Sequence, residues 1–106
     1  MLLTTTSTLQ GKEITQYLGI VSSEVIIGAN AFKDIAASFT DFFGGRSTTY
    51  ENTLKQAKDA VMQELIKDAT AVGANAVIGI DLDYETVGSS GSMLMVTACG
   101  TAVKII

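Results

Sequence analysis

Residues Tyr50–Glu85, YENTLKQAKDAVMQELIKDATAVGANAVIGIDLDYE, decide the fold, because they join one long helix to one long strand. Apolar residues recur at spacings of three and four, which predicts an amphipathic helix over 49–72. Gly73 stands where a left-handed residue would end that helix. Asn75–Thr86 then reads as a strand of similar length, so helix and strand can pack antiparallel as two layers. The predicted helix stripe consists of Leu54, Ala57, Val61, Leu65, Ala69 and Val72.

The strand predicted over 75–86 has two chemically different faces. Alternate side chains of a strand point to opposite faces, so residues two apart share a face. We expect one face to be apolar and the other to carry three carboxylates near its end. The first face holds Ala76, Ile78, Ile80, Leu82 and Tyr84, and the second holds Val77, Gly79, Asp81, Asp83 and Glu85.

The rest of the chain supplies further strands and one more helix. Two long β segments are expected at Glu13–Ile27, with a bulge near Gly19, and at Met93–Ile106; a short strand is expected at Leu2–Thr5. Phenylalanines at helical spacing predict an amphipathic helix over 30–43. We therefore expect a single domain over 1–106 of the α+β class, a two-layer fold with an antiparallel sheet and two helices on one face.

Composition narrows the class of protein. The chain has 106 residues, of which 47% are hydrophobic and 17% charged, against about 25% charged in ordinary domains. Its net charge of −4 gives no electrostatic reason to bind nucleic acid or an anionic membrane, and we expect neither partner. No run approaches the roughly 20 apolar residues of a membrane span. The single cysteine, Cys99, forms no internal disulfide, so we expect a cytoplasmic protein.

Gly44-Gly45-Arg46-Ser47, just before the long helix, is a candidate anion or ligand site. Backbone N–H groups at a helix N-terminus attract anions, and the Arg46 guanidinium would add a bidentate donor. The commoner explanation of such a sequence is a turn between helices followed by a cap, with Arg46 paired to a nearby carboxylate.

Asp81, Asp83 and Glu85 are a candidate cation site. Carboxylates at alternate strand positions lie roughly 6.5 to 7 Å apart on one face. Such oxygen ligands suit Ca²⁺, Mg²⁺ or Mn²⁺ better than soft metals. The simpler interpretation is a solvated polar end of the strand, or ion pairs with lysines of a neighbouring subunit.

Cys99 is a candidate ligand for a soft metal, with Met93 and Met95 on the same face of its strand. One cysteine in a chain without histidine falls far short of a zinc signature. A free cysteine more commonly serves as a small buried apolar residue. In a symmetric ring, however, each subunit would contribute one thiol around the axis, so the assembly could gather several soft ligands.

The sequence gives little reason to expect an enzyme. Without histidine the chain has no Ser–His or Cys–His pair to activate a nucleophile. Carboxylates could do acid–base chemistry, but no pattern indicates paired environments for them. We therefore expect a protein that is not an enzyme, with a carboxylate-based enzyme as an alternative.

Six short motifs carry a family resemblance across essentially the whole chain. They are Thr4–Thr6, Tyr17–Gly19, Gly44–Ser47, Gly73–Gly79, Asp81–Glu85 and Gly100–Val103. Together they resemble the YbjQ-like family of bacterial proteins, UPF0145, which carries a heavy-metal-binding label. The resemblance implies a fold like that of a dodecin subunit and assembly as a ring, a homopentamer.

Self-association also follows from the distribution of apolar residues. The strands Glu13–Ile27 and Met93–Ile106 are apolar on both faces, and the helices can cover only one. An uncovered face would exceed the few hundred Å² of apolar patch that monomers tolerate. We therefore expect a homo-oligomer that binds a small ligand or a metal ion at subunit interfaces. A structural or scaffolding oligomer without a ligand is the alternative.

Overall fold

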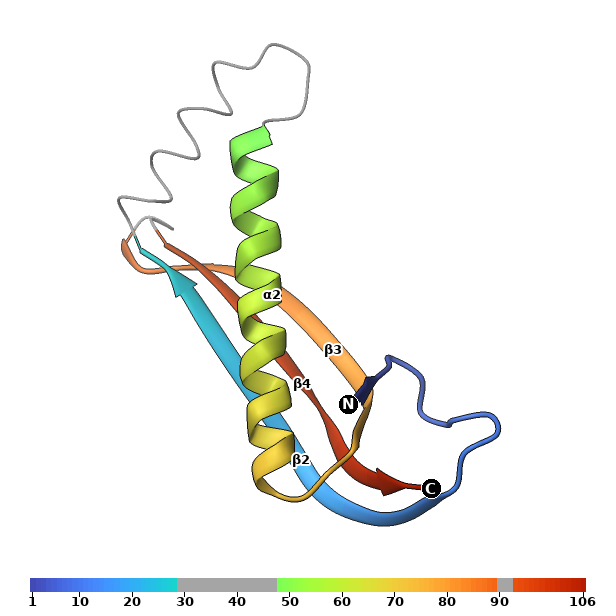
Figure 1. The fold of residues 1–106 in the computed structure, drawn as a ribbon. Helices are drawn as coiled ribbons and strands as arrows, with labels where there is room; N and C mark the ends of the chain where they lie inside the picture. The colour runs from blue at the N-terminus through green and yellow to red at the C-terminus, as the bar shows by residue number, and fades with distance from the viewer. Residues whose placement is uncertain (29–47, 90–92) are drawn as a thin grey trace.

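The computed structural model describes residues 1–28, 48–89 and 93–106, and these form one helix packed on one face of a four-stranded sheet (Figure 1). The helix predicted over 30–43 lies outside the described residues. The elements are β1 (Leu2–Leu3), β2 (Ile14–Ile27), α2 (Thr48–Ala71), β3 (Ala76–Val87) and β4 (Met93–Ile105). All five described elements therefore coincide, within three residues at each end, with predicted ones.

The sheet is mixed, with the strand order β1-β3-β4-β2. The antiparallel pairs β3–β4 and β4–β2 form most of it, whereas β1 pairs with β3 in parallel. The prediction of an antiparallel sheet was therefore wrong at one edge. The two strands run in the same direction, and β2 and α2 lie between them in the chain. The chain therefore goes from β1 to the opposite edge of the sheet, at β2, and returns before it forms β3.

Helix α2 ends in the way that its sequence predicts. Gly73 has a φ of 87°, its N–H donates to the carbonyl of Thr70 at 3.0 Å, and the N–H of Ala74 donates to the carbonyl of Ala69 at 3.0 Å. These two bonds form a Schellman motif, which satisfies carbonyls at the end of the helix. The motif turns the chain directly into β3.

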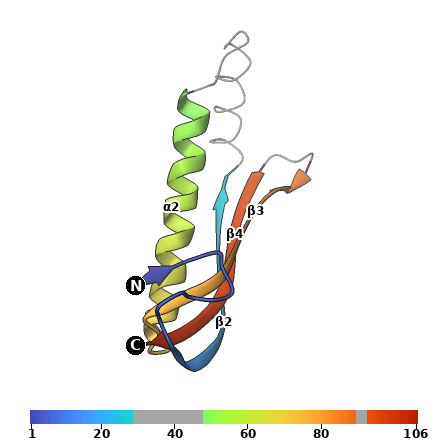
Figure 2. The same cartoon turned by 90° about the vertical axis from the view of Figure 1, so that its right-hand side faces the viewer.

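The buried stripe of α2 packs mainly on β2 and β4 and least on β3 (Figure 2). The Ser23 hydroxyl of β2 fixes this position by donating to the carbonyl of Val61 at 2.7 Å. Val72, predicted as part of the stripe, is 47% exposed, because α2 already ends at Ala71 and the chain is turning there. The buried members of the stripe are Ala57, Val61, Leu65 and Ala69.

A register shift at Gly79 changes which side chains of β3 face the helix. The pairing of β3 with β4 is interrupted between Ile78 and Asp81, and Gly79 has a φ of 62°. Val77 and Ile80 consequently both belong to the core under α2, whereas Ile78 packs in a second cluster. The predicted strict alternation over 76–84 was therefore wrong, because one extra residue in a bulge reverses the alternation.

The second cluster lies on the opposite side of the sheet from α2. Ala76, Ile78 and Val103 are buried there, and Leu9 from the segment before β2 and Ile14 at the start of β2 partly cover them. The Asn75 side chain closes this end of the sheet: its amide donates to the carbonyl of Ile105 at 2.8 Å and accepts from the N–H of the same residue at 2.7 Å.

The bulge predicted near Gly19 is confirmed. The pairing of β2 with β4 shifts between Tyr17 and Gly19, and Gly19 has a φ of 106°. After this bulge, Val21, Val25 and Ile27 pack in the core under α2. The intervening residues Ile20, Ser22, Glu24 and Ile26 are exposed on the other side of the sheet.

Candidate functional site

The candidate site is the part of the sheet that faces away from α2 and is not covered by the second cluster, here called the open face. Strand register arranges its side chains in rows across β3, β4 and β2. Each strand supplies alternate residues, because its other residues pack under the helix. The open face consists of Ile20, Ser22, Glu24, Ile26, Asp81, Asp83, Glu85, Met95, Thr97, Cys99 and Thr101.

Cys99 stands in the middle of this face. It pairs with Asp81 on β3 and with Ser22 on β2, so a carboxyl and a hydroxyl residue flank the thiol. The thiol is free and exposed, which overturns its interpretation as a small buried apolar residue. A shallow hollow of about 320 Å³ opens beside it, lined by Ser22, Ser23, Glu24, Thr97, Ala98 and Cys99. The thiol is therefore accessible to an ion or a second molecule.

The three carboxylates of β3 lie next to this row, as their spacing predicts. The bulge at Gly79 turns Asp81, Asp83 and Glu85 toward the open face, and all three are exposed. The pKa of Asp83 is raised above its ordinary value, first because its carboxyl is hydrogen-bonded to that of Asp81 and then through repulsion by that charge, desolvation and Glu85.

A single chain does not complete a metal site in the part that the structure describes. No three side chains among His, Cys, Asp and Glu come together there in an arrangement that could hold an ion. Met95 lies four residues from Cys99 along β4, which is about 13 Å for an extended strand. Two ligands of one ion lie within roughly 4.6 Å, taking about 2.3 Å for a metal–sulfur bond. One chain therefore offers Cys99 and its neighbour Asp81, but not the thioether.

The anion site predicted at Gly44, Gly45, Arg46 and Ser47 lies outside the described residues. Its placement relative to Cys99 and the carboxylates therefore stays a prediction.

Sequence reasoning missed the residues of β2 that complete the surroundings of the thiol. Ser22 and Glu24 reach the open face through the register of β2 with β4, where they pair with Cys99 and Thr97. No motif marks them, because their partners on β4 lie more than 70 residues away in the sequence. The three consecutive polar residues Ser22, Ser23 and Glu24 in an otherwise apolar strand are the signal that could have indicated an exposed face there.

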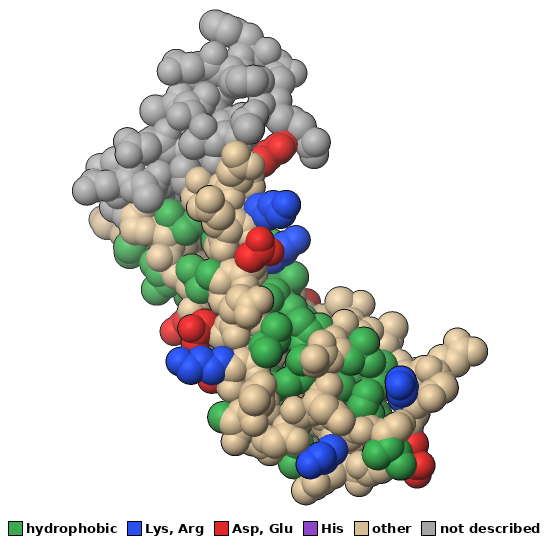
Figure 3. Space-filling view, viewed as in Figure 1, with side chains coloured by type: hydrophobic (Ala, Val, Ile, Leu, Met, Phe, Trp, Pro, Cys, Tyr) green, Lys and Arg blue, Asp and Glu red, His purple; other side chains and the backbone are tan. Residues whose placement is uncertain are grey.

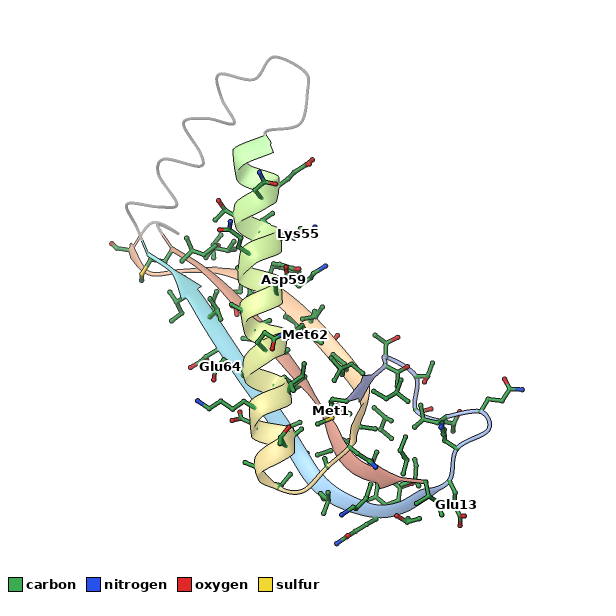
Figure 4. The ribbon with its side chains drawn as sticks, in the orientation of Figure 1. Met1, Glu13, Lys55, Asp59, Met62 and Glu64 are labelled. Carbon is green, nitrogen blue, oxygen red and sulfur yellow. The ribbon has the colours of Figure 1, made fainter. Side chains whose placement is uncertain are left out.

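Among the described residues, no helix has both the length and the hydropathy to cross a membrane. Helix α2 instead shows charged residues on its outer side, among them Lys55, Asp59 and Glu64 (Figure 4).

Three comparisons place the chain among known proteins. Its fold resembles the crystal structure of a protein with unknown function of the DUF74 family from Pediococcus pentosaceus, with a TM-score of 0.62 and 21% identity over 100% of this chain and 98% of that one. That likeness concerns the fold alone. A "UPF0145 protein" from Clostridium kluyveri is 59% identical over 105 residues, 99% of each chain. A family model described as "Putative heavy-metal-binding" matches residues 1–106. The chain therefore belongs to the YbjQ family of UPF0145 proteins.

Proposed function

We propose that this protein is a non-enzymatic homo-oligomer that binds a soft heavy-metal ion through the thiol of Cys99 at the interfaces between its subunits. The observation that carries the proposal is the position of Cys99, exposed in the middle of an otherwise uncovered sheet face. Thiolate is the side-chain ligand that soft ions prefer. The description of the family model as heavy-metal-binding supports the same chemistry.

More than one subunit is needed because one chain supplies too few ligands. Cys99 and Asp81 face each other across a strand pair, but no third ligand joins them among the described residues. A soft ion bound by only one thiolate and one carboxylate would dissociate readily into the solvent. Thiols from two or more subunits, brought together by a symmetric assembly, would provide the missing sulfur ligands.

Exposed apolar side chains support self-association. Ile20 is 85% exposed and Ile26 is 53% exposed. Both lie on the open face, as does Met95 of β4, the strand between β2 and β3. Exposed aliphatic side chains on one face are unfavourable, because their apolar surface stays in contact with water. A second subunit packed on this face would remove that surface from water. The ring form, its dodecin-like character and the number of five subunits follow from the family resemblance and are part of this proposal. The cytoplasmic location likewise stays a prediction.

A cadmium titration tests the proposal most simply. Purified protein is reduced, stripped of metal and titrated with Cd²⁺, and binding is followed by calorimetry and by the ultraviolet absorption of the Cd²⁺–thiolate bond. We expect wild-type protein to bind less than one ion per chain, and Cys99→Ser to lose the absorption band. Met95→Leu is the matched control, since it removes a sulfur from the same face but leaves the thiol. Equal uptake by wild type and Cys99→Ser would refute the thiol site.

The alternative of a scaffold without a ligand makes a different prediction for the same samples. It gains some support from the incomplete ligand set of one chain. Under this alternative the protein assembles normally, but Cd²⁺ binds weakly and with no difference between wild type and either variant.

A further inference from the structure

Helix α2 is placed off the centre of the sheet, and this leaves β3 poorly covered. The helix packs mainly on β2 and β4 and least on β3. A groove of about 370 Å³ therefore lies open between α2 and the β1–β3 edge, lined by Leu3, Thr4, Thr5, Met62, Ile80 and Leu82. Hydrophobic side chains are visible beside α2 in the space-filling view (Figure 3), and Met62 projects from the helix (Figure 4).

The edge of β3 beside this groove is unpaired over half of its length. β1 and the residues after it bond to β3 only as far as Ile80, whose N–H donates to the carbonyl of Thr4 at 3.1 Å. From Asp81 to Val87, β3 pairs with β4 on one side and has no strand on the other within the described part of the chain. The opposite edge of the sheet, β2, likewise has no second partner strand among those residues.

We propose that the free edge of β3 takes up β2 of a second copy of this chain, in a head-to-tail arrangement that repeats around a ring. This inference rests on the self-association in the proposed function and specifies which surfaces meet. The second copy's β2 carries its own α2 with it, because that helix packs mainly on β2. The arriving helix then covers the groove beside β3, which is the part of the sheet that the chain's own helix leaves open.

Strand direction agrees with this pairing. β2 and β3 both run antiparallel to β4 and are therefore parallel to each other. If the copies of a ring are related by rotation about an axis that runs along the strands, the strands of every copy point the same way. The second copy's β2 would therefore lie parallel to β3. β1 already pairs in parallel with this same edge. The incoming strand would thus continue the line of β1 toward Val87.

Charge disfavours the competing arrangement, in which two β3 edges meet across a two-fold axis. That contact would bring Asp81, Asp83 and Glu85 of both copies side by side on one face. Like charges in adjacent strands are destabilising. β2 carries a single carboxylate, Glu24, between Ile14 and Ile27, so it is the more favourable neighbour. A contact of unlike edges also repeats into a closed ring instead of stopping at a dimer.

Closure in this way decides which side of the sheet lies inside. Helices occupy more width than strands, so they take the outer circumference, and the open face lines the interior. Cys99 of every copy would then face the same central space. The carboxylates of β3 would line that space as well.

Disulfide trapping between edges tests the pairing without any metal. Starting from Cys99→Ser, one set of variants carries a single cysteine on β3 and a second, tagged set carries one on β2; pairs are co-refolded and mildly oxidised. A disulfide needs Cα atoms within about 6.8 Å, which only neighbouring strands provide. The β3 set is Asp83→Cys and Glu85→Cys, and the β2 set is Thr15→Cys, Tyr17→Cys, Ile20→Cys, Ser22→Cys, Glu24→Cys and Ile26→Cys.

We expect at least one β2–β3 combination to cross-link in high yield, whereas samples with one variant alone do not. Gln63→Cys, on an exposed side of α2, is the control and should cross-link with neither set. Cross-links between two β3 cysteines, or none between β2 and β3, would overturn the proposal. Because Cys99 is absent, this result is independent of whether the protein binds metal.

A substitution in the groove gives a second, independent measurement. Leu82 is half-buried and lines the groove, so Leu82→Lys should lower the mass in light scattering to smaller species while circular dichroism still shows a folded chain. Gln63→Lys adds the same charge to an exposed site and should leave the mass unchanged. If Leu82→Lys fails to fold, the cross-linking result alone decides; an unchanged mass in a folded Leu82→Lys would contradict the pairing.

Discussion

Asp81 lies directly opposite Cys99 where β3 pairs with β4, on the side of the sheet that the helix does not cover. This relationship depends on the bulge at Gly79, because without the extra residue Asp81 would have pointed toward α2. A single backbone irregularity therefore brings the carboxylates to the same face as the thiol.

Gly100 should not tolerate a side chain. A Cβ atom at this position would lie 2.7 Å from Cγ1 of Val77 and 3.0 Å from the carbonyl oxygen of Ile78. We expect Gly100→Ala to destabilise the protein by about 1 to 3 kcal/mol, the usual cost of overpacking a core. Urea unfolding at fixed protein concentration measures it. Gly28→Ala, where nothing lies within 4 Å, is the control; equal losses in both variants would contradict the packing described.

Asn75 should contribute to stability through its side chain. Its amide and carbonyl groups make two hydrogen bonds to the backbone of Ile105, at 2.8 and 2.7 Å. We expect Asn75→Ala to cost about 1 to 2 kcal/mol, since hydrogen bonds contribute about 1 kcal/mol each. Asn75→Asp keeps the acceptor but sets a carboxylate oxygen against the carbonyl oxygen of Ile105, so it should be no more stable than the alanine variant at neutral pH. A thermal unfolding series in which either variant is as stable as the wild type would contradict this account.

Asp83 should make stability depend on pH in an unusual direction for an aspartate. Its pKa is raised in the folded protein by the hydrogen bond to Asp81 and by repulsion. The folded state therefore holds the proton more tightly than the unfolded state. The resulting stabilisation is complete below the ordinary Asp value near 3.8 and is lost as the pH rises through the higher folded pKa.

The variant Asp83→Asn tests this sign. It removes the repulsion that exists once Asp83 ionises, so its melting temperature should exceed that of wild type at pH 7. At pH 3, where the wild-type carboxyl is already neutral, the two melting temperatures should agree. Glu24→Gln, on β2 of the same face, serves as the control. A larger gain at pH 3 than at pH 7 would show that the pKa is lowered instead.

Asp81 should assist metal binding without being sufficient for it. It is the carboxylate opposite the thiol, and a carboxylate is a weaker ligand than a thiolate for a soft ion. We expect Asp81→Asn to weaken Cd²⁺ binding several-fold and to leave the thiolate absorption in place, whereas Cys99→Ser abolishes both. If Asp81→Asn stays folded but loses the absorption band, the assignment of Cys99 as the principal ligand and Asp81 as an assisting one would be contradicted.

The elements of this fold could be predicted because their signals are local. Helix α2 has a regular apolar stripe and a glycine at its end, and β4 is a long run rich in apolar residues that follows a glycine- and serine-rich stretch. The faces of β3 could not be predicted, because Gly79 reads as an ordinary member of the alternating pattern. A bulge depends on how a strand meets its neighbour, and that information lies in β4.

The exposure of Cys99 could not be predicted from the neighbouring residues in the sequence, for a related reason. A cysteine between alanine and glycine in an apolar strand is typical of a buried position. Its exposure follows from tertiary structure: α2 covers one face of the sheet, and the segment before β2 covers only the other end of the second face. The three carboxylates, in contrast, were correctly placed together on one face, since their spacing of two survives after the bulge.

Native mass spectrometry of the protein loaded with Cd²⁺ tests the central claim most directly, because one spectrum reports both the number of subunits and the number of ions. The account predicts an assembly of several chains that retains fewer ions than chains, and an assembly of the same size without ions for Cys99→Ser. A folded species with the mass of one chain, or the same number of ions retained by Cys99→Ser, would contradict it.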